Sequence, residues 1–324
     1  MGAFGPGRRR IIDILSIGEA MVEFSSRGEI RYAEEFSKAY AGDALNTAVM
    51  AKRLGSHVGF LTGLADDPFA FGLQQLFLME GLDTRPSRKI TGGFTGMYFI
   101  AQEENGNREF LYYRKGSAAS MIGERDITPR LFESLKMVYA TGVTLGLSPS
   151  MRQAVYKAFA MARERKIMTV FDPNFRNRLW KNRAEAFDAM EGLLPYVDVI
   201  MPTVPDDTQP TIGLHRLDQV VEYFWYKGVP LVVAKAGEQG CYLGFRRQIE
   251  HVPALKIDRV VDPTGAGDAF NGGFLHGLAT GRSLLDCARL GITAAGLKVQ
   301  RDGALKSLPN RESVYSRAFS MSAS

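Results

Sequence analysis

The stretch Asp262–Phe274, DPTGAGDAFNGGF, places Gly265 and Gly267 directly before an apolar segment with helical spacing. Glycine is costly at a helix start unless the backbone must turn tightly or approach something closely. The unpaired N–H groups and positive dipole end of such a helix bind anions, and small residues such as Ala266 leave room for a phosphate. Asp268 in the first turn is favoured electrostatically. Its carboxylate could accept a proton from a hydroxyl that attacks the phosphate.

This stretch is neither of the two common phosphate-binding motifs. The chain contains no GxxxxGKS or GxxxxGKT sequence, and Phe270 follows where a dinucleotide-binding fingerprint has its third glycine. A second interpretation stays open on spacing alone. In that interpretation Asp268 only caps the helix, and the glycines allow the helix to pack closely on a strand.

The rest of the chain alternates short apolar runs with amphipathic helical patterns. Strands are predicted at 11–17, 57–64, 137–143, 168–173, 197–202 and 230–237, and helices at 44–54, 69–81, 151–165, 183–194 and 216–227. Buried strands that alternate with helices are typical of a mostly parallel sheet covered on both faces. We therefore predict a three-layer α/β/α fold whose ligands bind beyond the carboxyl ends of the strands.

Two early segments break this rhythm. GEAMVEFSS with EIRYAEEF, and the run TGMYFIAQEENGNREFLYYR, are typical of antiparallel strands, the second with a hairpin at Asn105–Asn107. Residues of about 18–35 and 92–116 are therefore predicted to form a small sheet that covers the site as a lid. Residues 11–318 are predicted to form one domain with this lid inserted, after a disordered tail at 1–10.

Composition and charge argue against several classes of protein. The chain has 324 residues, 45% of them hydrophobic and 23% charged, as expected of a globular protein. Its net charge of +5 comes partly from Arg8–Arg10, so the body is nearly neutral and nucleic-acid binding is not expected. No apolar run is long enough to predict a membrane span. Cys241 and Cys287 are far apart in the sequence, which suits a cytoplasmic protein.

Two signatures in the chain resemble those of a known family. DPTGAGDAFNGGFL is similar to the C-terminal signature of the ribokinase-like (PfkB-type) carbohydrate kinases, and AGDALNTAVMAKRLG to their N-terminal signature. The resemblance covers residues 12–309. Within the family, FTGMYF, FLYYRKGSAAS and DPNFRNRLW are most similar to the 2-keto-3-deoxygluconate (2-dehydro-3-deoxygluconate) kinases. The resemblance implies transfer of the ATP γ-phosphoryl group, with Mg²⁺, to the terminal hydroxyl of a sugar acid.

Position by position, the resemblance implies Asp268 as the general base and Gly265, Ala266 and Gly267 as the anion hole. The positions that it assigns to the sugar or sugar acid are Glu23, Gly42, Asp43, Asn46, Tyr98, Tyr112, Arg114, Arg176 and Asp302. The positions that it assigns to ATP are Asn174, Arg176, Lys235, Gly237, Gly240, Gly265 and Gly267.

A sugar acid agrees with the charges at these positions. Arg114 and Arg176 could pair with its carboxylate or with phosphate, whereas a neutral sugar would need neither. Without the resemblance, Arg114 would be interpreted as an exposed hairpin residue. Because neighbours on a strand point to opposite faces, only one of Tyr112 and Tyr113 is expected to touch the ligand.

The chain departs from the family pattern at the Asn-x-x-Glu motif, which supports the Mg²⁺ and phosphate network in relatives. Thr203–Asp206 stands there, so Asp206 is a weak metal candidate. Asp207 could substitute for it, the motif could be lost with weak activity as the result, or phosphates and water alone could hold the metal. Ala41 replaces the first glycine of the N-terminal signature, and its methyl group could narrow the sugar pocket. The resemblance leaves open whether K⁺ activates the enzyme near Asp262.

Other functions also stay open. The acceptor could be fructose, ribose or a nucleoside, and the altered motif at Thr203–Asp206 is compatible with a non-catalytic sugar-binding descendant of the fold. The edge strand predicted at 107–114 leaves backbone groups unpaired, and a second copy could cover them. We therefore predict a homodimer through the lids.

Overall fold

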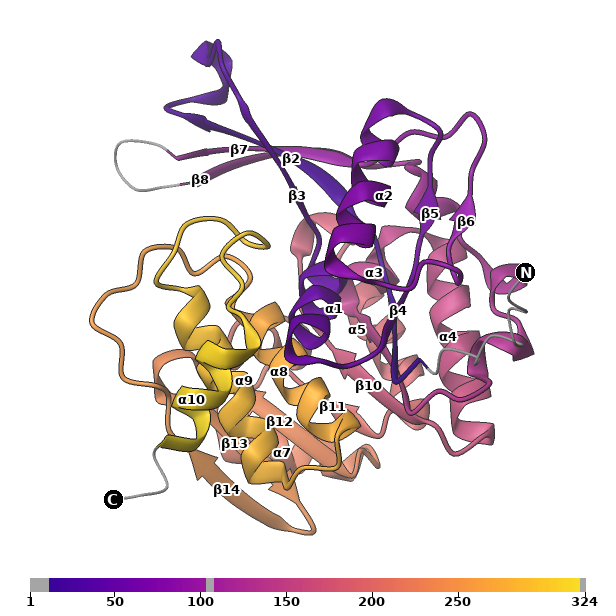
Figure 1. The fold of residues 1–324 in the computed structure, drawn as a ribbon. Coiled ribbons are helices and arrows are strands. Elements are labelled where there is room, and N and C mark those ends of the chain that lie inside the picture. The colour runs from indigo at the N-terminus through magenta and orange to yellow at the C-terminus, as the bar shows by residue number, and fades with distance from the viewer. Residues whose placement is uncertain (1–11, 103–107, 321–324) are drawn as a thin grey trace, which may run out of the picture.

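The computed structural model describes residues 12–102 and 108–320. Its main sheet contains eight strands in the order β14-β13-β12-β11-β10-β9-β1-β4 (Figure 1). The strands from β4 to β12 in this order pair in parallel, and β13 and β14 are antiparallel additions at one edge. The bounds are β1 Ile14–Ile17, β4 Val58–Leu61, β9 Met137–Thr141, β10 Met168–Asp172, β11 Val199–Ile200, β12 Leu231–Lys235, β13 Cys241–Phe245 and β14 Gln248–Val252. The predicted mostly parallel sheet is confirmed.

Helices cover both faces of this sheet, as predicted. Ile14 and Tyr139 lie in one core with α1, α8 and α9, whereas their neighbours Leu15 and Val138 lie in the other core with α4, α5 and α7. This division follows from the alternation of side chains along each strand. The helices are α1 Asp43–Leu54, α2 Pro68–Glu80, α3 Gly142–Leu147, α4 Pro149–Glu164, α5 Arg183–Leu193, α6 Thr208–Ile212, α7 Leu217–Tyr226, α8 Ala266–Ala279, α9 Leu284–Lys298 and α10 Arg311–Ser320. None of the described helices is both long and apolar enough to cross a bilayer.

A second sheet of four strands stands off the main one (Figure 1). Its order is β3-β2-β7-β8, with β2 parallel to β7 and the other pairs antiparallel. Its strands are β2 Met21–Arg27, β3 Ser37–Ala41, β7 Met97–Gln102 and β8 Arg108–Tyr113, and a separate short pair is β5 Gly63–Leu64 with β6 Arg88–Lys89. The predicted turn at 105–107 and the tail at 1–10 lie outside the described residues.

The prediction of a strand in EIRYAEEF is wrong. Ile30–Tyr32 forms one turn of 3-10 helix with no buried residue, and the strand that pairs with β2 is β3 instead. None of residues 29–36 is buried. In contrast, Ala41 at the end of β3 packs in the core of the small sheet.

The strand order reverses at β1 and β9, and a ligand is expected at that point in a sheet of this kind. The chain runs from β1 to β4 on one side and later returns to β9 on the other, so the order reverses at this point. In open α/β sheets ligands bind outside the carboxyl ends of the strands at such a reversal. The ends of β9 and β10, at Thr141 and Asp172, lie at this edge.

Candidate active site

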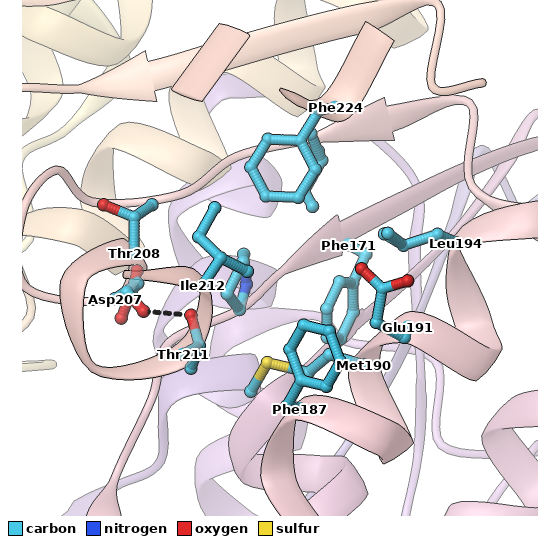
Figure 2. A pocket seen from close by; sticks show the side chains of 12 residues that line it. Phe171, Phe187, Met190, Glu191, Leu194, Asp207, Thr208, Thr211, Ile212 and Phe224 are labelled. Atoms are coloured by element: carbon cyan, nitrogen blue, oxygen red, sulfur yellow. Dashed lines mark hydrogen bonds between the residues drawn. The ribbon is translucent and has the colours of Figure 1, made fainter. Parts of the chain in front are cut away.

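An internal cavity lies near the carboxyl end of β10 and is not the candidate site. Its volume is about 20 Å³, and mostly apolar side chains such as Phe171, Met190 and Phe224 line it, together with Asp207 (Figure 2). This volume holds about one water molecule. A sugar or a nucleotide needs several hundred cubic ångströms, so the site must lie elsewhere.

The start of α8 has the geometry of an anion-binding corner. Gly265 caps the helix with a left-handed φ of 78°, which favours glycine. A Cβ atom placed on Gly267 would lie 3.7 Å from Nζ of Lys235, and one on Gly265 would lie 3.6 Å from Nδ2 of Asn46. A cationic group and an amide therefore flank the helix N-terminus, where an anion is favoured.

Asp268 is buried in the first turn of α8. Its Oδ2 accepts a hydrogen bond from Nδ2 of Asn46 at 2.8 Å, and its backbone oxygen accepts one from Oγ1 of Thr47 at 3.3 Å. Burial and the nearby Asp43 carboxylate raise the pKa of Asp268 to about 7, although the Asn46 hydrogen bond and the Arg176 charge act in the opposite direction. A carboxylate with a pKa near neutrality suits general base catalysis.

Asn46 has an unsatisfied atom beside Asp268. Within the described part of the chain, its buried Oδ1 has no hydrogen-bond partner. Buried polar atoms in proteins nearly always have a partner. A hydroxyl group of a ligand at this position would supply the missing donor.

The N-terminus of α1 is the second helix end at the site. A Cβ on Gly42 would lie 2.3 Å from the backbone oxygen of Glu19, so only glycine fits there. Next to it, Oδ2 of Asp43 accepts hydrogen bonds from Oγ1 of Thr141 at 2.6 Å and from Nδ2 of Asn174 at 3.0 Å. The structure thus joins Asp43, which the resemblance assigns to the sugar, to Asn174, which it assigns to ATP.

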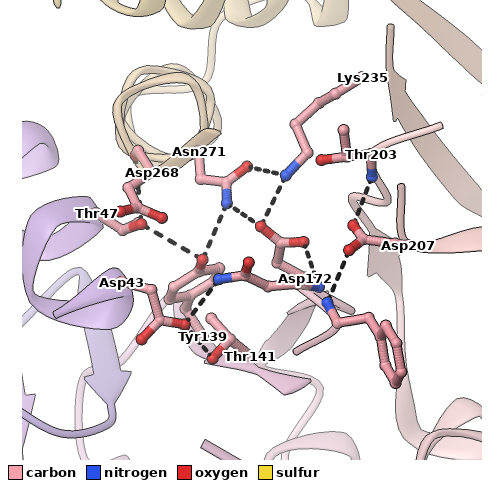
Figure 3. Close-up of polar contacts among 12 residues, drawn as sticks. Asp43, Thr47, Tyr139, Thr141, Asp172, Thr203, Asp207, Lys235, Asp268 and Asn271 are labelled. Atoms are coloured by element: carbon pink, nitrogen blue, oxygen red, sulfur yellow. Dashed lines mark hydrogen bonds and ion pairs between the residues drawn. The ribbon is translucent and has the colours of Figure 1, made fainter. Parts of the chain in front are cut away.

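A buried polar network connects α8 to the sheet (Figure 3). Oδ2 of Asp172 accepts hydrogen bonds from Nζ of Lys235 at 2.7 Å and from Nδ2 of Asn271 at 2.5 Å. Asn271 also donates to the hydroxyl oxygen of Tyr139 at 3.0 Å. Lys235 was predicted from the sequence, whereas its two partners, Asp172 and Asn271, and the tyrosine Tyr139 that Asn271 contacts were not. Asn271 could have been found, because it lies three residues after Asp268 and therefore on the same side of the helix.

The loop after β11 carries Asp206, the acid of the altered family motif, and Asp207, the acid that could substitute for it. The buried Asp207 carboxylate accepts hydrogen bonds from the backbone N–H groups of Phe175 and Thr203, both at 2.7 Å. Burial and the neighbouring Asp172 raise the pKa of Asp207 to about 6. Asp206 is exposed to solvent. Among residues 12–102 and 108–320, no three His, Cys, Asp or Glu side chains are grouped to hold a metal ion.

One face of the small sheet carries several predicted sugar-binding residues. Tyr98 stacks on Tyr112 with ring centroids 5.5 Å apart, and its hydroxyl donates to Glu23. Burial raises the pKa of Glu23. Tyr113 packs against Phe99 at 6.0 Å, so Tyr112 and Tyr113 lie on opposite faces, as the alternation predicts.

The two arginines assigned to the ligand have different surroundings. Arg114 is largely buried, with Nη2 only 2.7 Å from Oε2 of the buried Glu19, whose other oxygen accepts a hydrogen bond from Ser117. Arg176 is exposed, and its Nη1 donates to the backbone oxygen of Phe175 at 2.8 Å. Arg176 is therefore the more accessible cation for an anionic ligand.

The remaining predicted residues, Gly237, Gly240 and Asp302, lie outside the α-helices and β-strands. Gly240 has a φ of 95°, and a Cβ there would lie 2.1 Å from the backbone oxygen of Val252. Gly237 faces open space, because a Cβ atom placed on it would meet no atom of the more distant described residues within 4 Å. Asp302 is exposed and pairs with Lys306 at 3.0 Å.

Comparison with known proteins defines the class. Residues 12–311 match the pfkB family of carbohydrate kinases. This chain therefore belongs to that family, as its two signatures predicted. The match includes α1, α8 and the polar network that connects α8 to the main sheet.

Individual relatives narrow the comparison. The chain is 32% identical over 304 residues to the 2-dehydro-3-deoxygluconokinase of Thermoproteus tenax, covering 93% of this chain and 92% of the relative. A PfkB protein from Polaromonas sp. JS666 has a similar structure, with a TM-score of 0.84, 28% identity and coverage of 94% and 99% of the two chains. A putative ribokinase II from E. coli in complex with ATP and Mg²⁺ has a TM-score of 0.85 at 22% identity, with coverage of 94% and 98%.

Proposed function

We propose that this protein is an ATP-dependent kinase of 2-dehydro-3-deoxygluconate. The observation that carries the proposal is the buried Asp268 carboxylate in the first turn of α8, next to the Gly265–Gly267 backbone and 2.8 Å from Asn46. The sequence similarity to a kinase named for this sugar acid supports the choice of acceptor.

In this mechanism the acceptor hydroxyl lies against Asp268 and Oδ1 of Asn46. Asp268 accepts the hydroxyl proton while the hydroxyl oxygen forms a bond to the γ-phosphorus and the bond between that phosphorus and ADP breaks. The N–H groups at the start of α8 and the Lys235 ammonium stabilise the charge on the phosphoryl oxygens. ATP supplies the phosphoryl group.

The residues present fit ATP with Mg²⁺. The anion-binding corner suits phosphates, and the related structure with ATP and Mg²⁺ supports the same pair of ligands here. Because no cluster of protein ligands occurs among the described residues, the phosphates and water would supply most of the metal ligands. Asp206 stays the weak candidate for one protein ligand.

The acceptor carboxylate needs a cation, and we assign Arg176 to it first because that side chain is exposed. Arg114 stays a predicted contact of the acceptor carboxylate, although its guanidinium group already forms an ion pair with Glu19. Glu23, Tyr98 and Tyr112 on the small sheet would cover the sugar. The cytoplasmic location predicted from the cysteines belongs to this proposal, as does a homodimer through the small sheet.

A coupled assay of ADP release over a panel of sugar acids and neutral sugars tests the proposal. We expect Mg²⁺-dependent turnover with 2-dehydro-3-deoxygluconate, and a loss of about 10²–10⁴-fold in kcat for Asp268→Asn, because the general base is removed. Asp286 also lies in the first turn of a helix, α9, and serves as the matched control. Asp286→Asn should keep full activity.

The alternatives give different results in the same experiments. If fructose, ribose or a nucleoside is the best acceptor in the panel, that compound replaces the sugar acid as the proposed substrate. Sugar binding measured by calorimetry, without turnover at any Mg²⁺ concentration, would indicate a non-catalytic descendant. Full activity of Asp268→Asn would show that Asp268 is not the general base.

A further inference from the structure

Lys298 is a completely buried lysine at the end of α9, with 0% of its side chain exposed. Its Nζ donates a hydrogen bond to the backbone oxygen of Asp262 at 2.7 Å and lies 3.8 Å from Oδ2 of the same residue. A buried ammonium is costly unless oxygen atoms replace its hydration shell. The positive charge also lies at a helix C-terminus, where the dipole favours a cation.

Asp262 connects this lysine to the anion-binding corner. Its Oδ1 accepts a hydrogen bond from the backbone N–H of Thr264, and its Oδ2 accepts one from that of Gly303, both at 2.9 Å. The first bond shapes the turn that leads into Gly265. The second joins this turn to the loop that carries Ala304, which packs in the core of the small sheet. The position of Asp262 therefore sets the position of the helix start that would bind phosphate.

We infer that the ammonium group of Lys298 is a built-in monovalent cation that holds the Asp262–Gly265 turn in place, so that the enzyme needs no K⁺ there. Backbone carbonyl and carboxylate oxygens of this kind are the groups that replace the hydration shell of K⁺ in proteins. An ion at the Asp262 oxygen would meet the ammonium at short range, and like charges in a buried environment repel strongly. The residues around Asp262 therefore do not fit a K⁺ ion.

Lys298 is in this view a positioning residue that acts through Asp262. The effect on turnover rests on the proposed kinase function, but the effect on the fold does not. The two can therefore be measured separately, by ADP release and by thermal unfolding.

The test compares K⁺ with tetramethylammonium at equal ionic strength, using full-length protein freed of K⁺, Na⁺ and NH₄⁺. We expect the wild-type turnover and Tm to be the same in both salts. Lys298→Ala leaves space beside Asp262, so we expect its Tm to be higher in K⁺, and K⁺ to restore part of an activity reduced about tenfold or more. Lys136 has similar partners, because its Nζ contacts both the backbone oxygen of Ala279 at the end of α8 and the carboxylate of Asp13. Lys136→Ala is the matched control and should show no response to K⁺.

Saturable activation of the wild type by K⁺ would overturn the inference, as would a K⁺ response of Lys298→Ala equal to that of Lys136→Ala. If Lys298→Ala does not fold, Lys298→Met takes its place in the same comparison. If neither variant folds, the titration of the wild-type enzyme with K⁺ decides by itself whether K⁺ is needed. A wild type without turnover on any acceptor would contradict the proposed function, while the Tm comparison would still test Lys298.

Discussion

At the scale of single residues, the environment of Asp268 combines opposing influences. Burial and Asp43 disfavour the ionised carboxylate, whereas Asn46 and Arg176 favour it, and together they raise its pKa to about 7. A weaker base would be ionised but poor at accepting a proton, and a stronger one would be protonated at neutral pH. The hydrogen bond from Asn46 is therefore part of the tuning as well as a positioning contact.

This balance predicts the pH dependence of turnover. Asp268 acts as a base only when ionised, so kcat should rise as the pH increases through about 7 and reach a plateau above it. Asn46→Ala removes a bond that lowers the pKa, so the midpoint of its profile should move to higher pH. Thr47→Val is the control, because Thr47 contacts the backbone oxygen of Asp268 and not its carboxylate. An unchanged midpoint in Asn46→Ala would contradict this assignment.

At the scale of elements, a buried ion pair joins the small sheet to the main sheet. Glu19 lies between β1 and β2, and Arg114 and Ser117 follow β8. The pair therefore links the point where the chain enters the small sheet to the point where it leaves β8. Removing one partner of a buried pair costs far more than removing both, because the remaining charge is left without compensation.

Arg114→Ala should accordingly lower the free energy of unfolding by about 3–5 kcal/mol, since it leaves Glu19 buried and unpaired. The double variant Glu19→Gln/Arg114→Met removes both charges and should recover most of that loss. Urea denaturation measures both. If Arg114 also contacts the ligand, the double variant should still bind a sugar acid more weakly than the wild type does. Wild-type stability of Arg114→Ala would show that the pair has no structural role.

The loop after β11 gives a second prediction at this scale. Asp207→Ala deprives two backbone N–H groups of their acceptor and should destabilise the fold by about 2–4 kcal/mol. Asp206 is exposed, so Asp206→Asn should leave the unfolding free energy unchanged. A higher KM for ATP at low Mg²⁺ in Asp206→Asn would support Asp206 as the metal ligand. An unchanged KM for ATP would show that Asp206 is not a metal ligand.

At the scale of the whole molecule, the face of the small sheet opposite to Glu23, Tyr98 and Tyr112 is our candidate for a dimer interface. Phe24, Phe36 and Phe99 cluster on this face, with ring centroids 5.1 and 5.3 Å apart for the two contacts of Phe99. Leu111 and Tyr113 on the same face are 41% and 55% exposed, and β8 is an edge strand. Exposed apolar patches and open strand edges both favour association.

We therefore expect the wild type to elute as a dimer in size-exclusion chromatography with light scattering. Leu111→Glu places a charge in the proposed interface and should shift the protein to a monomer. Tyr226 is 85% exposed on α7, a helix that packs, among the described residues, against the main sheet and not against the small one. Tyr226→Glu is therefore the control and should stay dimeric. A monomeric wild type at micromolar concentration would contradict the interface.

The sequence alone determined the alternation of strands and helices in the parallel part of the main sheet, the start of α8, and the acid in its first turn. These features depend on local patterns: apolar periodicity, glycine at a helix cap, and an acidic residue near a helix N-terminus. The strand expected in EIRYAEEF did not form, because β2 pairs with β3 instead and none of residues 29–36 is buried. The remaining candidate residues of the site were predicted from the resemblance to the family and not from local patterns.

Only the tertiary structure decided the partners of the charged side chains. Asn46 and Asp268 lie 222 positions apart in the sequence, yet they form one hydrogen bond. Arg114 pairs with Glu19, Asp207 holds two backbone amides, and the ammonium of Lys298 lies against Asp262. Local periodicity sets which face of an element is buried, but the partner of a buried charge depends on which distant elements pack against that face.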